Sequence, residues 1–232
     1  MIRIENLCHR YEDSDGDTFV YNDFNIVIED GEFIVLTGKS GSGKTTLLKL
    51  LIKETEPISG TINVDGKDIS KIKKKDVPYY RRNIGVLFQD FKLITDIDVY
   101  DNLHAAILAT GGSGKEADNK ITHVLSMLGI DHLYKRYPKE MSGGEQQKVC
   151  LARAVINHPK YLLVDEPTGN LDPASSAEIV RLLDIIHRQG ITIIMATHDL
   201  NIADSGDRRR VDLDSINPGL LGDEKVSLPD DG

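Results

Sequence analysis

The stretch Gly38-Lys-Ser-Gly-Ser-Gly-Lys44-Thr45 constrains this chain more than any other part of its sequence. It matches the pattern G-x-x-x-x-G-K-[ST]. It follows the apolar residues 33–36, which predict a buried parallel strand, and it precedes a helix predicted over residues 44–53. Glycines allow successive backbone N–H groups to point inward, and a helix start adds positive potential there. The pattern therefore predicts a phosphate-binding loop within an α/β fold.

Lys44 and Thr45 carry the chemistry of this loop. Lys44 is expected to reach the β- and γ-phosphates of a nucleotide, and Thr45 to coordinate Mg²⁺. The alternative is a flexible Gly-Ser loop, which leaves the preceding strand and the following helix unexplained. A second glycine-rich stretch, residues 111–115, joins two predicted helices and is interpreted as a plain loop. The candidate nucleotide-binding residues here are Gly38, Lys39, Ser40, Gly41, Ser42, Gly43, Lys44, Thr45 and Thr46.

Composition excludes several other classes of protein. The 232 residues are 40% hydrophobic and 28% charged, as in an ordinary soluble globular domain. The net charge of −9 disfavours binding to nucleic acid, because an acidic surface repels phosphate backbones. Two cysteines make no disulfide framework, and the start of the chain has no apolar segment of a signal peptide. No apolar run approaches the ~18 residues of a membrane span, so action at a membrane requires another chain.

Strand and helix patterns alternate along the chain around a helical insert. Strands are predicted at residues 2–7, 24–28, 33–36, 61–64, 84–88, 161–164 and 191–196, and residues 11–17 are expected to form a loop. Ser113–Glu116 and Ser142–Glu145 each predict a capping box, and Asp172 an N-cap. The expected fold is a single α/β domain, with a mostly parallel sheet and antiparallel strands near the N-terminus. Residues 1–90 and 159–232 are expected to form its core with a β subdomain, and residues 91–158 a helical subdomain.

Two carboxylates end the predicted strand at residues 161–164. A buried strand rarely ends in two charges unless a cationic or polar group meets them. Asp165 is expected to bind Mg²⁺, and Glu166 to polarise an attacking water as general base; the alternative is a solvated strand end. His198 follows another strand at the same edge, where it can contact a γ-phosphate and hold the water and the base in register. Taken alone, it would be interpreted as an ordinary histidine.

Met141-Ser-Gly-Gly-Glu145-Gln-Gln resembles the signature of ATP-binding cassette (ABC) ATPases, and residues 2 to about 204 follow the order of that family. Residues 38–46 then correspond to Walker A, Asp165 and Glu166 to Walker B and the catalytic glutamate, and His198 to the switch histidine. The resemblance also implies that Gln89 is the Q-loop glutamine, which senses Mg²⁺ and the γ-phosphate. By the same resemblance Leu171-Asp172 is the D-loop, and Tyr11 stacks on adenine.

Four signature residues open a predicted helix and so make a second anion site: Ser142, Gly143, Gly144 and Glu145. The alternative, that Ser142 and Glu145 only cap the helix, is compatible with this role. The resemblance implies that the helix start closes on ATP held by a second copy, giving an ATP-dependent, head-to-tail homodimer. Met141 and Lys148 replace the usual leucine and arginine, and the segment from Arg208 onward departs most from the family.

Within the family, residues 82–91, 99–103 and 165–172 resemble the FtsE group of cell-division ATPases. That resemblance implies an FtsX-like transmembrane subunit, a peripheral place on the cytoplasmic face of the membrane, and control of septal peptidoglycan hydrolysis. Phe91, Leu93 and Tyr100 are candidates for the contact with that subunit, or for core packing. Lipoprotein-release and macrolide-export ATPases are the alternative, differing in their membrane partner. Nucleic-acid or translation ATPases of the superfamily have two cassettes in one chain or a long coiled coil, and 232 residues leave room for neither. A nucleotide-regulated scaffold without turnover is disfavoured because Lys44, Asp165, Glu166 and His198 are all present.

Overall fold

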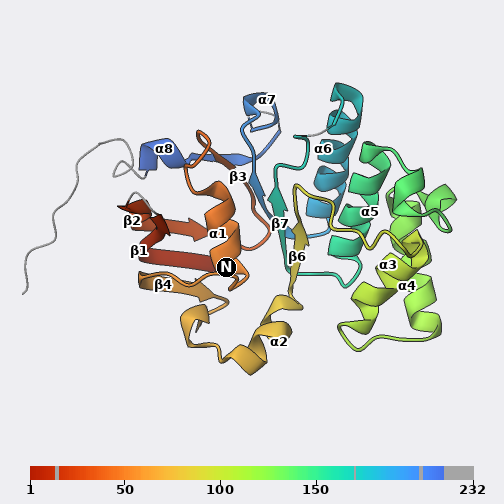
Figure 1. Ribbon diagram of the computed structural model, residues 1–232, viewed down its shortest axis with the longest axis horizontal. Coiled ribbons are helices and arrows are strands. Elements are labelled where there is room, and N and C mark those ends of the chain that lie inside the picture. Colours follow the sequence, from red (N-terminus) through yellow and green to blue (C-terminus); the bar gives the residue numbers. More distant parts are fainter. Residues whose placement is uncertain (14–15, 170, 204–205, 217–232) are drawn as a thin grey trace, which may run out of the picture.

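The computed structural model contains two β-sheets with helices around them (Figure 1) and describes residues 1–13, 16–169, 171–203 and 206–216. The larger sheet has five parallel strands in the order β6-β7-β8-β3-β9, and the smaller has four antiparallel strands in the order β2-β1-β4-β5. The expected fold class, a parallel sheet joined by antiparallel strands from the N-terminal part, is confirmed.

Short apolar runs form the three central strands of the parallel sheet and the edge strand β6: β3 (Phe33–Thr37), β7 (Tyr161–Asp165), β8 (Thr192–Ala196) and β6 (Ile84–Leu87). Every residue of β3, β7 and β8 is buried, as expected for strands covered on both faces. Ala196 at the end of β8 pairs with Leu36 on one side and Asp165 on the other. The carboxyl ends of these strands therefore meet at one edge.

The parallel sheet separates two hydrophobic clusters. Ile34 and Leu36 pack in the cluster that includes α1 (Lys44–Leu51) and the antiparallel sheet, whereas Phe33 and Val35 face the other. Alternation along the strand sends successive side chains to opposite faces. The second cluster includes residues of four helices: α3 (Val99–Leu108), α4 (Lys115–Met127), α5 (Gly143–Val155) and α6 (Pro173–His187).

The antiparallel sheet consists of β1 (Ile2–Asp13), β2 (Gly16–Ile28), β4 (Ser59–Val64) and β5 (Lys67–Asp68). The expected loop at residues 11–17 is wrong where the structure describes it: β1 continues to Asp13, β2 begins at Gly16, and Tyr11 pairs with Thr18. Hydrogen bonds between the two strands extend the hairpin beyond its apolar part, so polar residues there gave no strand signal. Ser14 and Asp15 lie outside the described residues.

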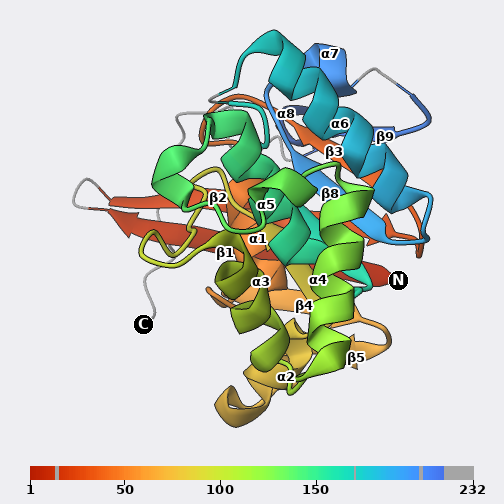
Figure 2. The ribbon, with the colours of Figure 1, turned by 90° about the vertical axis from the view of Figure 1, so that its right-hand side faces the viewer.

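Figure 2 shows α3, α4 and α5 side by side, and they contact one another in pairs. The capping box predicted at Ser142 is confirmed, as is the N-cap at Asp172. The box predicted at Ser113 is wrong. Gly114 is the N-cap of α4, with no side-chain cap, because its left-handed φ of 65° turns the chain into the helix one residue later.

The C-terminal part adds α7 (Leu200–Ala203), β9 (Arg209–Asp212) and α8 (Leu213–Ile216), and α2 (Val77–Arg81) precedes β6. No strand pattern was found in the sequence of β9, which pairs with β3 at the sheet edge and is anchored by the Arg209–Glu32 ion pair at 2.7 Å. Residues 204–205 and 217–232 of the tail lie outside the described residues. Among the helices that the structure describes, none combines the length and apolar character that crossing a bilayer requires.

Candidate active site

The loop between β3 and α1 is shaped by glycines that accept left-handed backbone angles. Gly43, with φ 96°, is the N-cap of α1. A Cβ atom on Gly43 would lie 2.7 Å from the Val20 side chain and 2.8 Å from the Tyr21 hydroxyl. The Tyr21 hydroxyl donates to the Gly43 carbonyl at 2.7 Å. Only glycine fits here, and the spacing of the motif gave no hint that Tyr21 braces the loop.

Lys44 lies with its ammonium at the centre of this loop. Its Nζ donates to the carbonyls of Gly38 at 2.7 Å and Lys39 at 2.9 Å. The first turn of α1 has no acidic residue and no side-chain cap, so its backbone N–H groups remain available to an anion. A cavity of about 590 Å³ opens over the loop, lined by Tyr11, Val20, Ser40, Gly41, Ser42, Gly43, Lys44, Thr45, Thr46, Gln89, Glu166 and His198.

Thr45 and Asp165 form a pair of oxygen donors beside the cavity. The Thr45 hydroxyl donates to Asp165 Oδ1 at 3.0 Å. Burial raises the pKa of Asp165, and the nearby Glu166 charge adds to the rise, whereas the Thr45 hydrogen bond lowers it. Within the described residues, no three His, Cys, Asp or Glu side chains converge to hold a metal alone. A hydroxyl and one carboxylate fit Mg²⁺ that shares phosphate oxygens, since Mg²⁺ prefers such mixed oxygen ligands.

Glu166 and His198 form a hydrogen-bonded pair across the ends of β7 and β8. His198 Nδ1 donates to Glu166 Oε2 at 2.9 Å, and the His198 backbone N–H donates to the same oxygen at 3.3 Å. Glu166 has a left-handed φ of 44°, and its N–H donates to the Ala196 carbonyl at 2.9 Å. Its side chain is 15% exposed, against 72% for His198. The strained backbone turns this carboxylate toward the cavity.

Gln89 and Tyr11 enter the same cavity from different sheets. Gln89 follows β6 at the carboxyl edge of the parallel sheet and is exposed. Tyr11 comes from β1, and its hydroxyl lies 3.2 Å from the Thr46 hydroxyl. The buried His9 ring and the Tyr11 ring pack in a T-shaped arrangement, with their centroids 5.1 Å apart. Tyr11 is 43% exposed and lines the cavity, so it is available for the predicted contact with adenine.

The signature residues at the start of α5 do not line this cavity in the described part of the chain. Ser142 Oγ accepts from the Glu145 N–H at 3.3 Å, and Glu145 Oε2 accepts from the Ser142 N–H at 2.8 Å. These hydrogen bonds lower the pKa of Glu145. Gly144 approaches α6 so closely that a Cβ would lie 2.9 Å from Ser175 Oγ, whereas a Cβ on Gly143 would meet its nearest atom at 3.6 Å. Gly143 thus has room that Gly144 lacks.

Two further contacts at the site were missed from the sequence. The buried Gln147 Nε2 donates to the Pro167 carbonyl at 3.0 Å, which ties α5 to the turn after Glu166. Asp214 Oδ2 accepts from the Lys39 N–H at 3.0 Å, so α8 braces the phosphate-binding loop. Gln147 stands within the signature stretch, but nothing in the spacing gave its partner. Asp214 stands in the weakly patterned tail.

The residues after Gln89 are fixed to α5. Cys150 Sγ donates to the Phe91 carbonyl at 2.9 Å, and Arg153 donates to the carbonyls of Phe91 at 3.0 Å and Lys92 at 2.6 Å. Phe91 and Leu93 line a groove of about 300 Å³ that also includes Gln89, Pro138 and Gln146. Tyr100 is not in that groove; it stacks on His104 and donates to Asp118 at 2.6 Å.

Comparisons with known proteins agree with this geometry. The family model for ABC transporters matches residues 21–169. The chain is 40% identical over 205 residues to the cell division ATP-binding protein FtsE of Streptococcus pneumoniae serotype 2 (strain D39 / NCTC 7466), covering 88% of each chain. It is 43% identical over 202 residues to the protein of the same name from Escherichia coli (strain K12), covering 87% of this chain and 90% of that one.

Solved structures of nucleotide-binding cassettes have the same fold. A dimeric structure of MJ0796, a bacterial ABC transporter cassette, superposes with a TM-score of 0.82 at 31% identity, covering 92% of this chain and 95% of that one. A dimeric post-hydrolysis state of the same cassette, bound to ADP and Pi, has a TM-score of 0.79 at 31% identity, with 88% and 90% covered. The chain therefore belongs to the ABC transporter family, as an FtsE-like subunit that binds and hydrolyses ATP.

Proposed function

We propose that this chain is the ATPase subunit of an FtsE-like membrane complex. In it, closure of an ATP-bound dimer acts through an FtsX-like transmembrane subunit to regulate septal peptidoglycan hydrolysis. The observation that carries the ATPase part is the convergence of Lys44, the Thr45–Asp165 pair and the Glu166–His198 pair on one sheet edge. The division role is supported by the FtsE relatives from Streptococcus pneumoniae and Escherichia coli.

The residues of the loop bind and orient the triphosphate. The N–H groups at the start of α1 and the Lys44 ammonium hold its phosphates, and Tyr11 stacks on adenine. Thr45, Asp165 and Gln89 would hold Mg²⁺, and the bound ion would neutralise charge that develops on the phosphates. Glu166 accepts the proton of the attacking water, while His198, fixed by its Nδ1 contact, contacts the γ-phosphate through its other nitrogen.

The second half of each nucleotide site comes from another copy. The start of α5, residues 142–145, closes on the nucleotide held by its partner, so two ATP molecules lie in a two-fold symmetric dimer. The arrangement is supported by the lining of the chain's own cavity, which does not include these residues in the described part of the chain. The cassette neighbours solved as dimers support it further.

Residues 91–158 pass the motion to the membrane subunit. Phe91 and Lys92 are held by Cys150 and Arg153, so the segment after Gln89 moves together with the signature helix α5. The groove lined by Phe91, Leu93 and Gln146 receives a cytoplasmic segment of the membrane subunit. The subunit described here then sits on the cytoplasmic face of the membrane through that partner.

The catalytic part is tested with Glu166→Gln in the purified protein. We expect turnover to fall by about 10²–10⁴-fold, since general base catalysis typically contributes this much, with ATP affinity unchanged. The measurement is phosphate release together with nucleotide binding by calorimetry. The control is Glu116→Gln, a carboxylate on the exposed side of α4 that pairs with Lys120. Turnover of Glu166→Gln close to the unmodified protein contradicts the general-base role.

The division role is tested by the membrane subunit that copurifies with this chain from solubilised membranes. An FtsX-like protein with four spans and a large extracellular loop is the expected result. A lipoprotein-release or macrolide-export permease would instead assign the chain to export.

A further inference from the structure

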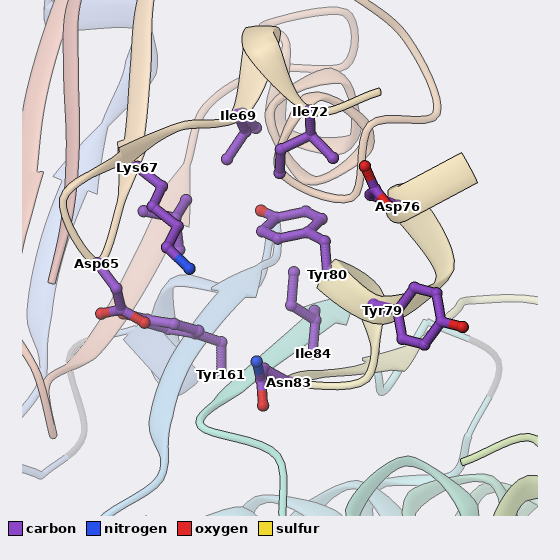
Figure 3. A pocket seen from close by; sticks show the side chains of 11 residues that line it. Asp65, Lys67, Ile69, Ile72, Asp76, Tyr79, Tyr80, Asn83, Ile84 and Tyr161 are labelled. Carbon is purple, nitrogen blue, oxygen red and sulfur yellow. The ribbon is translucent and has the colours of Figure 1, made fainter. Parts of the chain in front are cut away.

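A second pocket lies at the opposite edge of the parallel sheet, where β6 and β7 begin. It has a volume of about 330 Å³, and its walls are the apolar groups of Val64, Ile69, Ile72, Tyr80 and Ile84. Figure 3 shows the Tyr80 ring pointing into the pocket, while Tyr79 turns outward. The nucleotide site uses none of these residues, because it stands at the carboxyl ends of the strands.

The polar groups at the floor of this pocket already have partners. Asp65 accepts hydrogen bonds from the Tyr161 hydroxyl at 2.7 Å, from the Met1 amino group at 3.0 Å and from Lys160. The Tyr80 hydroxyl donates to the Leu51 carbonyl at 2.5 Å. The inside of the pocket is therefore mainly apolar surface, which favours an apolar side chain over a charged small molecule.

A positive rim surrounds this apolar interior. Residues 67–82 contain seven of the 28 Lys and Arg residues but only two of the 37 Asp and Glu residues, in a chain of net charge −9. Lys67 lines the pocket beside Asp76, and Lys73, Lys74 and Lys75 are exposed nearby. Among the described residues, no carboxylate lies within 4.0 Å of any of these four lysines. The rim attracts acidic groups, and the rest of the acidic surface repels them.

The pocket continues along β6 toward the Q-loop. Ile84 and Val86 are two residues apart in this edge strand, so they lie on one face of it, and Phe88 follows directly after its last residue. Ile84 lines the pocket, whereas Val86 and Phe88 line a neighbouring cavity of about 270 Å³ that reaches Gln89. Gln89 also lines the groove assigned above to the membrane subunit. One face of the molecule thus joins the pocket to that groove.

We propose that this pocket and its basic rim are a second docking site for the membrane subunit, which binds an acidic cytoplasmic segment carrying one apolar anchor side chain. The proposal rests on the proposed function, because it takes the Q-loop groove as the first contact. The anchor fills the concave apolar interior, and carboxylates on either side meet Lys67 and the lysines of residues 73–75. An anionic lipid surface would meet the lysines but leave the concave interior unfilled, so a peptide fits both features.

Site-specific photo-crosslinking of the complex with its membrane subunit tests the proposal. A benzophenone amino acid replaces Tyr79, which is 62% exposed at the pocket, in a complex reconstituted in nanodiscs with anionic lipid. Parallel complexes carry the probe at Ile94, exposed beside the Q-loop groove, and at Arg188, exposed at the end of α6. We expect position 79 to crosslink to an acidic cytoplasmic segment, position 94 to a different segment, and position 188 to neither.

The outcomes separate this proposal from the proposed function. Crosslinks from position 94 alone, or crosslinks from position 79 to lipid or to a second copy of this chain, overturn the second docking site and leave the Q-loop contact standing. Absence of crosslinks to the membrane subunit at both positions overturns both proposals.

Charge reversal gives an independent measurement. The triple variant Lys73→Glu, Lys74→Glu and Lys75→Glu should weaken binding of the membrane subunit about tenfold at low salt, and the loss should shrink at high salt. The isolated variant should keep its basal ATPase activity, since these residues lie away from the nucleotide site. The matched control reverses Lys115, Lys120 and Arg188, which lie on α4 and at the end of α6, away from both the pocket and the Q-loop groove. Equal binding by both triple variants contradicts the docking site.

Discussion

Two helices of this chain begin with small, glycine-rich segments, yet their starts differ. Helix α1 begins after Gly43 with no side-chain cap and no acidic residue in its first turn. Helix α5 begins after Ser142 with a complete capping box, in which Glu145 accepts two hydrogen bonds from Ser142. The position three residues after the N-cap is Thr46 in α1 and Glu145 in α5.

The difference assigns unequal roles to the two helix starts. The free N–H groups of α1 and the ammonium of Lys44 make a strong anion site that one chain supplies alone. At α5, a carboxylate already occupies part of the positive end of the helix dipole, so its attraction for phosphate is weaker. A site of this second kind contributes when another copy brings the phosphate to it. In the dimer proposed above, this asymmetry explains why one chain is enough to bind ATP whereas two copies are needed to enclose it.

The largest effect is expected from a substitution in the anion site at the start of α1. Lys44→Ala removes the ammonium that lies between the Gly38 and Lys39 carbonyls, and with it the charge-assisted contacts to phosphate. We expect ATP affinity to fall by about 10²-fold or more, measured by calorimetry on the isolated chain. Lys120→Ala, on the surface of α4, is the control. Unchanged affinity in Lys44→Ala shows that the α1 start is not the primary phosphate site.

An intermediate effect is expected from a substitution at the start of α5. Gly143→Asp places a carboxylate in the first turn of α5, where it stabilises the helix but repels an incoming triphosphate. The position has room, because a Cβ there meets only ordinary contacts at 3.6 Å and 3.9 Å. Turnover should fall about tenfold or more, with ATP affinity of the single chain unchanged and thermal stability retained. Gly144→Ala is unsuitable, since its Cβ would contact Ser175 at 2.9 Å.

The neutral variant Gly143→Asn separates charge from size. It should keep most of the activity that Gly143→Asp loses. Full activity of Gly143→Asp would mean that α5 does not meet phosphate in the closed state.

The smallest effect concerns stability and pH. The pKa of Glu145 is lowered from 4.5 chiefly by its hydrogen bond from the Ser142 N–H, so its folded-state contribution is present above that value. Glu145→Gln keeps an acceptor oxygen for the capping box but removes the negative charge, so it should lower the free energy of unfolding by about 0.3–1 kcal/mol at pH 7, as loss of an acidic group in the first turn of a helix does. The difference should vanish as the pH falls through the lowered pKa, measured by urea unfolding at several pH values. A difference that does not change with pH contradicts an ionised capping box.

The sequence predicted which residues meet at the carboxyl edge of the parallel sheet, because they follow apolar strands whose ends such a sheet brings together. Asp165, Glu166 and His198 are examples: each stands directly after a buried run, and the register of β7 with β8 places them side by side. The capping box at Ser142 was also predictable, since its two partners are three residues apart. The spacing of residues along the chain and the apolar periodicity are therefore enough to predict both the convergence of the strand ends and the capping box.

The parts that were missed depend on partners far away in the sequence. Strand β9 has no apolar run and forms because the edge of β3 offers hydrogen bonds. The contact of Asp214 with the Lys39 N–H and that of Gln147 with the Pro167 carbonyl join distant residues, and a single sequence contains no signal for either. At Ser113 the local pattern was present but a left-handed glycine overrode it. Tertiary pairing and backbone conformation decided these positions.

The central claim is that nucleotide bridges the α1 start of one copy and the α5 start of another. Molar mass by light scattering after size-exclusion chromatography tests it most directly, using Glu166→Gln so that ATP is not consumed. The account predicts a monomer without nucleotide and a dimer with MgATP, and a monomer in both conditions once Gly143→Asp is added. A Glu166→Gln protein that stays monomeric with saturating MgATP, or a dimer that Gly143→Asp leaves intact, contradicts it.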